Sequence, residues 1–180
     1  MDVDVALIER SWSGAPAVPA AFERLFRAEY ARVVRVAYRV LGDQAEAEDV
    51  AQDVFIAFYR THPADAPYAV PWLQRAAAHA ALNAVRSRSR RAAREERVAA
   101  GGEATADPEG AVLERERAHE VRLTLARMPR HAAELLALRY GGLSYAEVAA
   151  ATGTKIDQVG TRLRRAHDAF RKEASRGRRR

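Results

Sequence analysis

The chain has 180 residues and a formal net charge of +6; 48% of its residues are hydrophobic, but only 7% are aromatic. This composition predicts cores built from Ala, Leu and Val, which suit two small helical domains better than one large β-sandwich. The sequence contains no cysteine, which excludes a disulfide framework and a thiolate metal site. The five histidines show no metal-ligand spacing, so we expect neither a metal site nor a cofactor.

The first 19 residues hold Gly14, Pro16 and Pro19, a pattern that predicts an irregular segment. The start of the chain is acidic and lacks a long apolar run. It therefore predicts neither a signal peptide nor a transmembrane helix, and we expect a cytoplasmic protein.

An apolar pattern of helical period begins at Ala20 and predicts a long helix that ends at Gly42. Asp43, with Glu46 three residues later, is a capping-box-like start for a second helix at 44–61. Its outer face is acidic, and no Lys or Arg lies between Asp43 and Asp53. This face is either a solvated helix surface or a binding site for a basic protein partner.

A loop is predicted over 62–71, which contains three prolines, with Pro71 at the first position of the next helix. That helix becomes basic, with six arginines over 86–97. Aromatic rings beside a basic helix can stack on unpaired bases. For Phe58 and Trp72, however, filling the core is the simpler interpretation.

The segment 98–111 combines two adjacent glycines, a proline and small residues, which is typical of a flexible linker. Helices are expected from about Val112 to Met128 and again from Arg130 up to the glycine pair at 141–142. The basic tail, residues 176–180, is expected to be disordered.

The most informative stretch is 143–172. Ser144 and Glu147 form a capping box that starts a short helix, and Gly153 breaks it. The helix after the break has an apolar stripe formed by Ile156, Val159, Leu163, Ala166 and Phe170. Two helices that meet at a Gly-containing turn are typical of a helix-turn-helix, whose second helix enters the DNA major groove. A plain helical hairpin is the alternative.

The chain resembles extracytoplasmic-function (ECF) sigma factors of bacterial RNA polymerase in three segments. The first is AEAEDVAQDVFIAFYR (45–60), which resembles the acidic helix of their second conserved region. The second is PWLQRAAAHAALNAVRSRSRR (71–91), which resembles the basic helix that follows. The third is LARMPRHAAELLALRYGGLSYAEVAAATG (125–153), which resembles the start of their fourth region. The resemblance spans roughly residues 22–171.

This resemblance implies an all-α fold with two small helical domains joined by a flexible linker. A region-2-like domain is expected at 20–97, the linker at 98–111, and a region-4-like helix-turn-helix domain at 112–175. The implied function is to bind core RNA polymerase and to direct promoter recognition and DNA melting. The family is also commonly held inactive by an anti-sigma factor, which implies such a partner here.

The resemblance also implies roles for individual residues. The acidic helix docks on core polymerase, which implies contacts from Glu48, Asp49, Gln52 and Asp53. The basic helix and the loop before it read and melt the minus-ten element, which implies contacts from Tyr68, Trp72, Arg75, His79, Asn83 and Arg86. The last helix reads the minus-thirty-five element, which implies contacts from Lys155, Asp157, Gln158, Thr161, Arg162, Arg164 and Arg165.

Three residues depart from the family pattern. Lys155 stands where the family usually has a Ser cap, and Thr154, with Asp157 three residues later, is an alternative cap. His79 stands where the family usually has Asn, and Gly160 stands where it favours a basic residue. Glycine inside a helix costs about 1 kcal/mol relative to Ala, and it offers no DNA contact.

Two other functions remain as alternatives. A stand-alone helix-turn-helix regulator would bind duplex DNA without polymerase and would not need the acidic helix. An adaptor that binds only proteins would not need the basic face. The sequence shows no nucleophile–base pair, metal cluster or Gly-rich phosphate loop, so we do not expect an enzyme.

Overall fold

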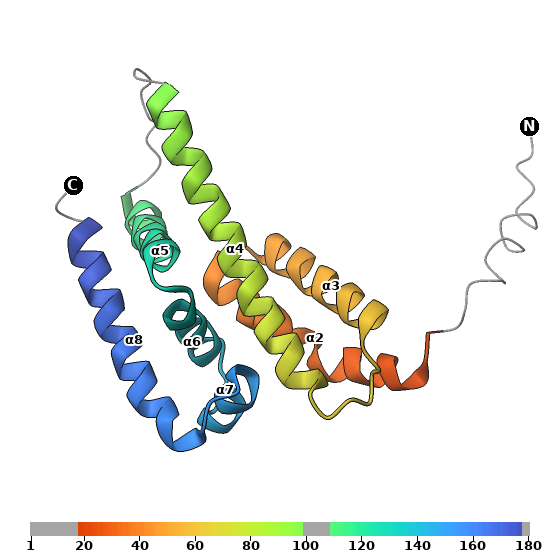
Figure 1. Ribbon diagram of the computed structural model, residues 1–180. Helices are drawn as coiled ribbons and strands as arrows, with labels where there is room; N and C mark the ends of the chain where they lie inside the picture. The colour runs from red at the N-terminus through yellow and green to blue at the C-terminus, as the bar shows by residue number, and fades with distance from the viewer. Residues whose placement is uncertain (1–17, 99–108, 178–180) are drawn as a thin grey trace, which may run out of the picture.

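The computed structural model describes residues 18–98 and 109–177, and the regular structure in this part of the chain is entirely helical (Figure 1). The helices are α2 (Ala20–Leu41), α3 (Gln44–Thr61), α4 (Ala69–Val98), α5 (Glu109–Arg127), α6 (Arg130–Tyr140), α7 (Tyr145–Thr152) and α8 (Ile156–Gly177). The predicted all-α class is therefore confirmed for the described residues.

Local signals determine where α2 ends and α3 begins. Gly42 adopts the left-handed conformation, with φ 72°, and its N–H donates to the carbonyl oxygen of Tyr38. Asp43 then caps α3, because its carboxylate accepts a hydrogen bond of 2.9 Å from the backbone N–H of Glu46. The Glu46 carboxylate departs from the predicted capping box and pairs instead with Arg88 of α4, at 2.7 Å.

Helices α2, α3 and α4 pack around an apolar core. Phe58 of α3 and Leu73 of α4 are fully buried. Helix α4 begins at Ala69, two residues before the predicted start at Pro71. Proline fits there because backbone N–H groups throughout the first turn have no intrahelical partner.

The helix-turn-helix forms as predicted at α7 and α8. Ser144 and Glu147 make both bonds of the capping box, and Gly153 ends α7 with φ 64°. Val159 is fully buried where the two helices meet. The predicted apolar stripe is wrong at Ile156, which is 58% exposed, because this first residue of α8 precedes the turn that packs on α7.

Two predicted boundaries are wrong by a few residues. Helix α5 begins at Glu109, three residues before the expected Val112, and α8 continues to Gly177, so the first two residues of the predicted tail are helical. The last turn of α8 lies against α5, since a Cβ built on Gly177 would meet the Arg127 guanidinium at 2.8 Å. Residues 1–17, 99–108 and 178–180 lie outside the described residues, and with them most of the predicted irregular N-terminal segment, linker and tail.

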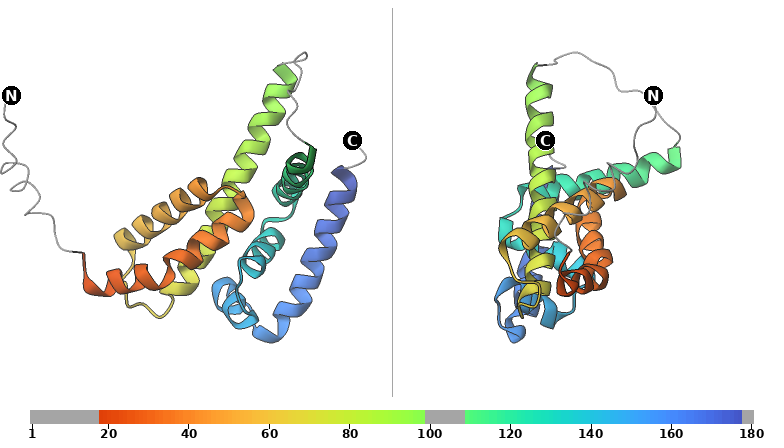
Figure 2. Two further views of the ribbon diagram at one scale, coloured as in Figure 1. Left: turned by 180° about the vertical axis from the view of Figure 1, so that it is seen from behind. Right: turned by 90° about the vertical axis from the view of Figure 1, so that its right-hand side faces the viewer.

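The N-terminal helices α2–α4 and the C-terminal helices α5–α8 pack against each other. Helix α4 contacts α5, α6 and α7, and α2 contacts α6. Figures 1 and 2 show α6 between the long α4 on one side and α8 on the other. This packing matters for the site because α4 carries most of the residues predicted to contact the minus-ten element.

Candidate polymerase and nucleic-acid interfaces

The acidic face predicted on α3 lies at the surface. Asp49, Gln52 and Asp53 are exposed, whereas Glu48 is half-buried and accepts a hydrogen bond of 2.6 Å from Gln44. The apolar side of the same helix is buried, as at Phe55. Carboxylates directed outward beside a buried stripe form a surface that complements a basic partner.

The residues predicted to contact the minus-ten element form one stripe. Their spacing of three or four residues places them on a single face of α4 and of the loop just before it. They are Tyr68, Trp72, Arg75, His79, Asn83 and Arg86. The structure thus brings all six together.

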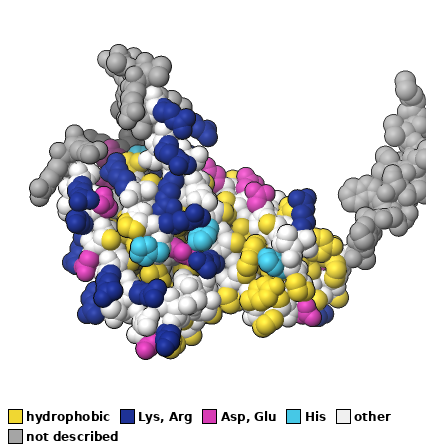
Figure 3. All heavy atoms as spheres, in the orientation of Figure 1, with side chains coloured by type: hydrophobic (Ala, Val, Ile, Leu, Met, Phe, Trp, Pro, Cys, Tyr) yellow, Lys and Arg dark blue, Asp and Glu magenta, His cyan; other side chains and the backbone are white. Residues whose placement is uncertain are grey.

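One end of this stripe is aromatic. The His62 ring lies 4.8 Å from the ring of Trp72 and 5.7 Å from that of Tyr68, and Trp72 also packs 5.4 Å from buried Phe58. Tyr68 remains 46% exposed, and Figure 3 shows a hydrophobic surface over this end of the molecule. Sequence reasoning treated His62 as an ordinary histidine. The signal that could have indicated its ring contacts was its place at one end of a short proline-containing loop that has Tyr68 near the other end.

In the middle of the stripe, two side chains meet one carboxylate from α6. Arg75 donates to Oε1 of Glu134 at 2.7 Å, and Nε2 of His79 lies 3.0 Å from the same oxygen. The Glu134 side chain is only 7% exposed, whereas Arg75 is 47% exposed, so a buried carboxylate meets a guanidinium that reaches the surface.

Farther along the stripe, Arg86 reaches the end of α5. It donates to the carbonyl oxygens of Ala126 and Met128, at 3.3 and 3.2 Å. Carbonyl oxygens at a helix C-terminus carry partial negative charge and favour a cation. The pKa of Arg86 is nevertheless lowered, chiefly by burial and then by the nearby positive charges of Arg130 and Arg90.

A further contact joins α2 to the helix-turn-helix. Arg32 donates to Oε1 of Glu147, while Oε2 of Glu147 accepts from the backbone N–H and the hydroxyl of Ser144, both at 2.8 Å. The pKa of Glu147 is lowered to about 2, mainly by the hydrogen bond from Arg32 and then by those from Ser144. One carboxylate therefore both caps α7 and holds α7 against α2.

This lowered pKa predicts an acid-sensitive contact. Below its ordinary value of 4.5 the released Glu147 carboxyl takes up a proton, whereas the paired carboxyl resists protonation until about pH 2. The stabilisation from Glu147 should be complete above pH 4.5 and be lost as the pH falls from 4.5 toward 2. Urea unfolding across this range should show wild-type stability falling more steeply than that of Glu147→Gln. Parallel curves for the two proteins would contradict the assignment.

The residues predicted to read the upstream element lie at the start of α8 and just before it. Lys155, Asp157, Gln158, Thr161, Arg162, Arg164 and Arg165 are all exposed. Gly160 interrupts this surface; a Cβ there would meet the Tyr145 ring at an ordinary 3.5 Å, so a side chain can be added without a clash.

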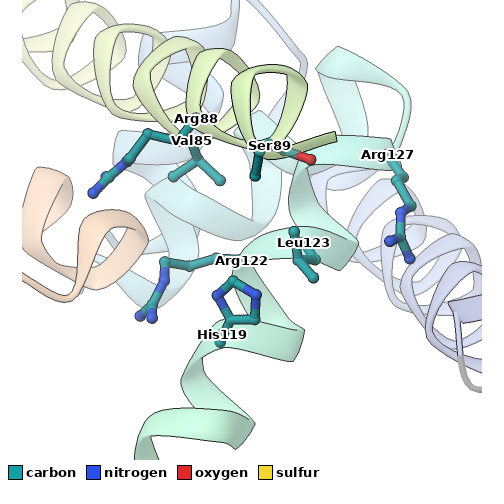
Figure 4. Close-up of a pocket in the computed structure, with 8 residues that line it drawn as sticks. Val85, Arg88, Ser89, His119, Arg122, Leu123 and Arg127 are labelled. Carbon is teal, nitrogen blue, oxygen red and sulfur yellow. The ribbon is translucent and has the colours of Figure 1, made fainter. Parts of the chain in front are cut away.

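A cationic cavity of about 310 Å³ lies between α4 and α5 (Figure 4). Arg88 lines it from α4, and His119, Arg122 and Arg127 line it from α5. Figure 4 shows Arg88 and Arg122 directed to the same side, while Arg127 points toward α8. The cavity lining thus holds three arginines, and Arg88 among them is paired with Glu46 of α3.

Two absences are recorded for the part of the chain that the structure describes. No group of three or more His, Cys, Asp or Glu side chains in 18–98 and 109–177 could hold a metal ion. Within the same ranges, no helix combines the length and apolarity needed to cross a membrane.

Comparison with known proteins relates both halves to transcription initiation. Residues 25–91 match the family model described as Sigma-70 region 2, and residues 118–167 match that described as Sigma-70, region 4. The chain is 31% identical to RNA polymerase sigma-H factor of Pseudomonas aeruginosa over 94% of this chain and 92% of that protein. It is 29% identical to ECF RNA polymerase sigma factor SigE of Mycolicibacterium smegmatis, over 88% of this chain and 63% of that protein.

A solved structure shares the fold. It is the structure of CnrH in complex with the cytosolic domain of CnrY. The two chains are 24% identical in sequence, the match covers 94% of this chain and 95% of that chain, and the TM-score is 0.50.

Proposed function

We propose that this chain, which belongs to the ECF sigma factors, uses three of its surfaces for polymerase binding and promoter recognition. Its general function follows from the family: it directs promoter recognition by RNA polymerase. The two conserved regions are both present, which disfavours a stand-alone helix-turn-helix regulator. Sigma factors act by binding, so we assign no catalytic step to the chain.

In our proposal, the acidic face of α3 binds core polymerase through Glu48, Asp49, Gln52 and Asp53. The stripe on α4 binds the melted minus-ten strand, with cations for phosphates and the aromatic end for stacking on unpaired bases. The exposed start of α8 enters the major groove of the minus-thirty-five element. The observation that carries this assignment is the continuous stripe from Tyr68 to Arg86, whose aromatic and basic parts lie on one face.

We also propose an anti-sigma protein partner and a cytoplasmic location. CnrH, which shares the fold, was solved in complex with the cytosolic domain of CnrY, which supports a polypeptide partner. The location follows from the proposed partners, since core polymerase and promoter DNA are found in the bacterial cytoplasm.

The polymerase interface is tested by reversing two charges on α3. Asp49→Arg combined with Asp53→Arg should weaken binding to core polymerase by about tenfold or more, since both carboxylates would face a basic partner. Because both residues are exposed, the circular dichroism spectrum should remain that of the wild type. Affinity is measured by fluorescence anisotropy with purified core enzyme.

The matched control makes the same change in net charge elsewhere. Glu23 and Asp168 are exposed and pair with arginines on their own helices, so Glu23→Arg with Asp168→Arg should leave polymerase binding almost unchanged. If both double variants bind core polymerase like the wild type, the acidic face of α3 is not the polymerase interface.

A further inference from the structure

The cavity between α4 and α5 has the size and the lining of a small-molecule site. Its volume of about 310 Å³ falls at the lower end of the range that such sites occupy. Val85, Ala92 and Leu123 give it apolar walls, while Ser89 and His119 add polar groups from the two helices. Apolar walls with a few polar groups are typical of a pocket that binds a small ligand.

The positive charge of the cavity is only partly balanced. Arg88 is paired with Glu46 of α3, whose carboxylate oxygens lie 2.8 and 2.7 Å from its two terminal nitrogens. Arg122 and Arg127, by contrast, have neither a carboxylate partner nor a hydrogen bond in the part of the chain that the structure describes. Two arginines of the lining can therefore still take a negatively charged partner.

Each of these two guanidinium groups lies beside the end of a helix. A Cβ built on Gly42, which ends α2, would lie 2.7 Å from Nη1 of Arg122, and one built on Gly177 of α8 would lie 2.8 Å from Nη1 of Arg127. A helix C-terminus offers only about half of an elementary negative charge. A phosphate group carries more charge, and a guanidinium can donate two parallel hydrogen bonds to its oxygens. Phosphate is therefore the stronger partner for both arginines.

The cations stand at two ends of the cavity. Arg88 and Arg122 are directed to one side, whereas Arg127 points toward α8 (Figure 4). In the same view the side chains of Ser89 and His119 lie between these ends. An anion with a phosphate group at each end would meet an unpaired arginine at both. The hydroxyl and the imidazole between them can donate hydrogen bonds to the remaining oxygens.

We propose that the cavity between α4 and α5 binds a compact anion with two phosphate groups, either diphosphate itself or a small bisphosphorylated metabolite. Arg122 holds one phosphate group and Arg127 the other, while Ser89 and His119 bind oxygens between them. Because the ligand contacts both helices, its binding stabilises the folded chain. None of these residues belongs to the surfaces that we assign to polymerase or promoter DNA, so the site stands independently of the proposed function.

The site is tested by isothermal titration calorimetry of the full-length protein with inorganic pyrophosphate. The ionic strength is fixed because salt screens exposed charges, and divalent cations are left out because they would bind the ligand. The wild type should bind one equivalent with a Kd on the order of 100 µM or tighter. Pyrophosphate at about 100 times this Kd should raise the thermal unfolding midpoint by about 5 °C or more.

Three variants test the two arginines and the space between them. Arg122→Gln and Arg127→Gln each remove one unpaired charge and should weaken pyrophosphate binding by about tenfold or more. Ser89→Leu changes no charge but fills the middle of the cavity, so it should weaken binding to a similar extent. Arg24→Gln is the matched control, because this exposed arginine of α2 does not line the cavity, and it should bind like the wild type. Circular dichroism confirms that each variant is helical.

The outcomes distinguish a built site from general attraction between opposite charges. Absence of both heat and thermal shift with the wild type would overturn the proposal, as would equal weakening by Arg24→Gln and the cavity variants. Equal affinity for pyrophosphate and orthophosphate would also overturn it, because only pyrophosphate carries two phosphate groups.

Two further titrations identify the source of the phosphate groups. A hexose bisphosphate that binds more tightly than pyrophosphate indicates a metabolite, and weaker binding indicates diphosphate; both results support the site. A single-stranded oligonucleotide is the contrary case. If it binds more tightly than either small anion and loses affinity in the same cavity variants, the cavity is part of a nucleic-acid surface and the proposal is wrong.

Discussion

Run-off transcription is expected to fall by about a hundredfold when Asn83 and Arg86 are both replaced by alanine, because a base-specific contact contributes about 1–3 kcal/mol. Asn83 is exposed on the stripe of α4, and Arg86 lies one turn farther on. The amide can pair with the edge of an unpaired base, and the guanidinium can bind a phosphate or guanine. The assay uses saturating core polymerase at fixed salt, because phosphate contacts depend on ionic strength.

The comparison variants lie on α8. Arg165→Ala should reduce transcription only modestly, by about threefold, as expected for an exposed phosphate contact. Gly160→Arg should raise affinity for the upstream element, because the site has room for a side chain beside Tyr145. A near-total loss for Arg165→Ala beside little effect at Asn83 and Arg86 would show that the upstream element dominates instead.

Replacement of Phe58 by alanine is expected to lower the free energy of unfolding by about 3–5 kcal/mol, since it leaves a cavity in a closely packed core. Phe58 is fully buried, and its ring packs 5.4 Å from that of Trp72. Because typical domains are stable by only about 5–15 kcal/mol, this loss brings the protein close to unfolding. Urea unfolding followed by circular dichroism at 222 nm measures the change.

The control for this substitution is on the same helix. Ile56 is 47% exposed, so Ile56→Ala should cost no more than about 1 kcal/mol. Loss of Phe58 should also disturb the aromatic end of the stripe, because Trp72 rests on it. Equal unfolding midpoints for Phe58→Ala and the wild type would mean that this ring is not part of the core.

The features that were predicted best from the sequence are those that depend on residues close together along the chain. Gly42, Ser144 and Gly153 determine helix ends through their own backbone conformation or a bond three residues away, and all three act in the structure as expected. Ile156 shows the limit of this reasoning. Its spacing fits the apolar stripe of α8, but burial also requires a neighbour, and at the first residue of the helix none covers it.

Contacts between the two halves could not be predicted in this way. Glu134 lies in a helix of ordinary composition, 59 residues from Arg75 along the chain, and no local pattern links them. Arg32 and Glu147 are 115 residues apart, and the capping box alone explained Glu147 before the fold was known. The six residues of the α4 stripe were predicted from the family resemblance, but the contacts that α6 and the end of α5 make with Arg75, His79 and Arg86 were not.

Arg75 and His79 have two roles on one surface, because they contact Glu134 of α6 in the structure and, in our proposal, meet the promoter. A substitution at either position is therefore expected to change both promoter preference and the packing of α4 on α6. Promoter choice and stability are then linked traits at these two positions. A substitution of Glu134, which touches no DNA in our proposal, changes the packing alone.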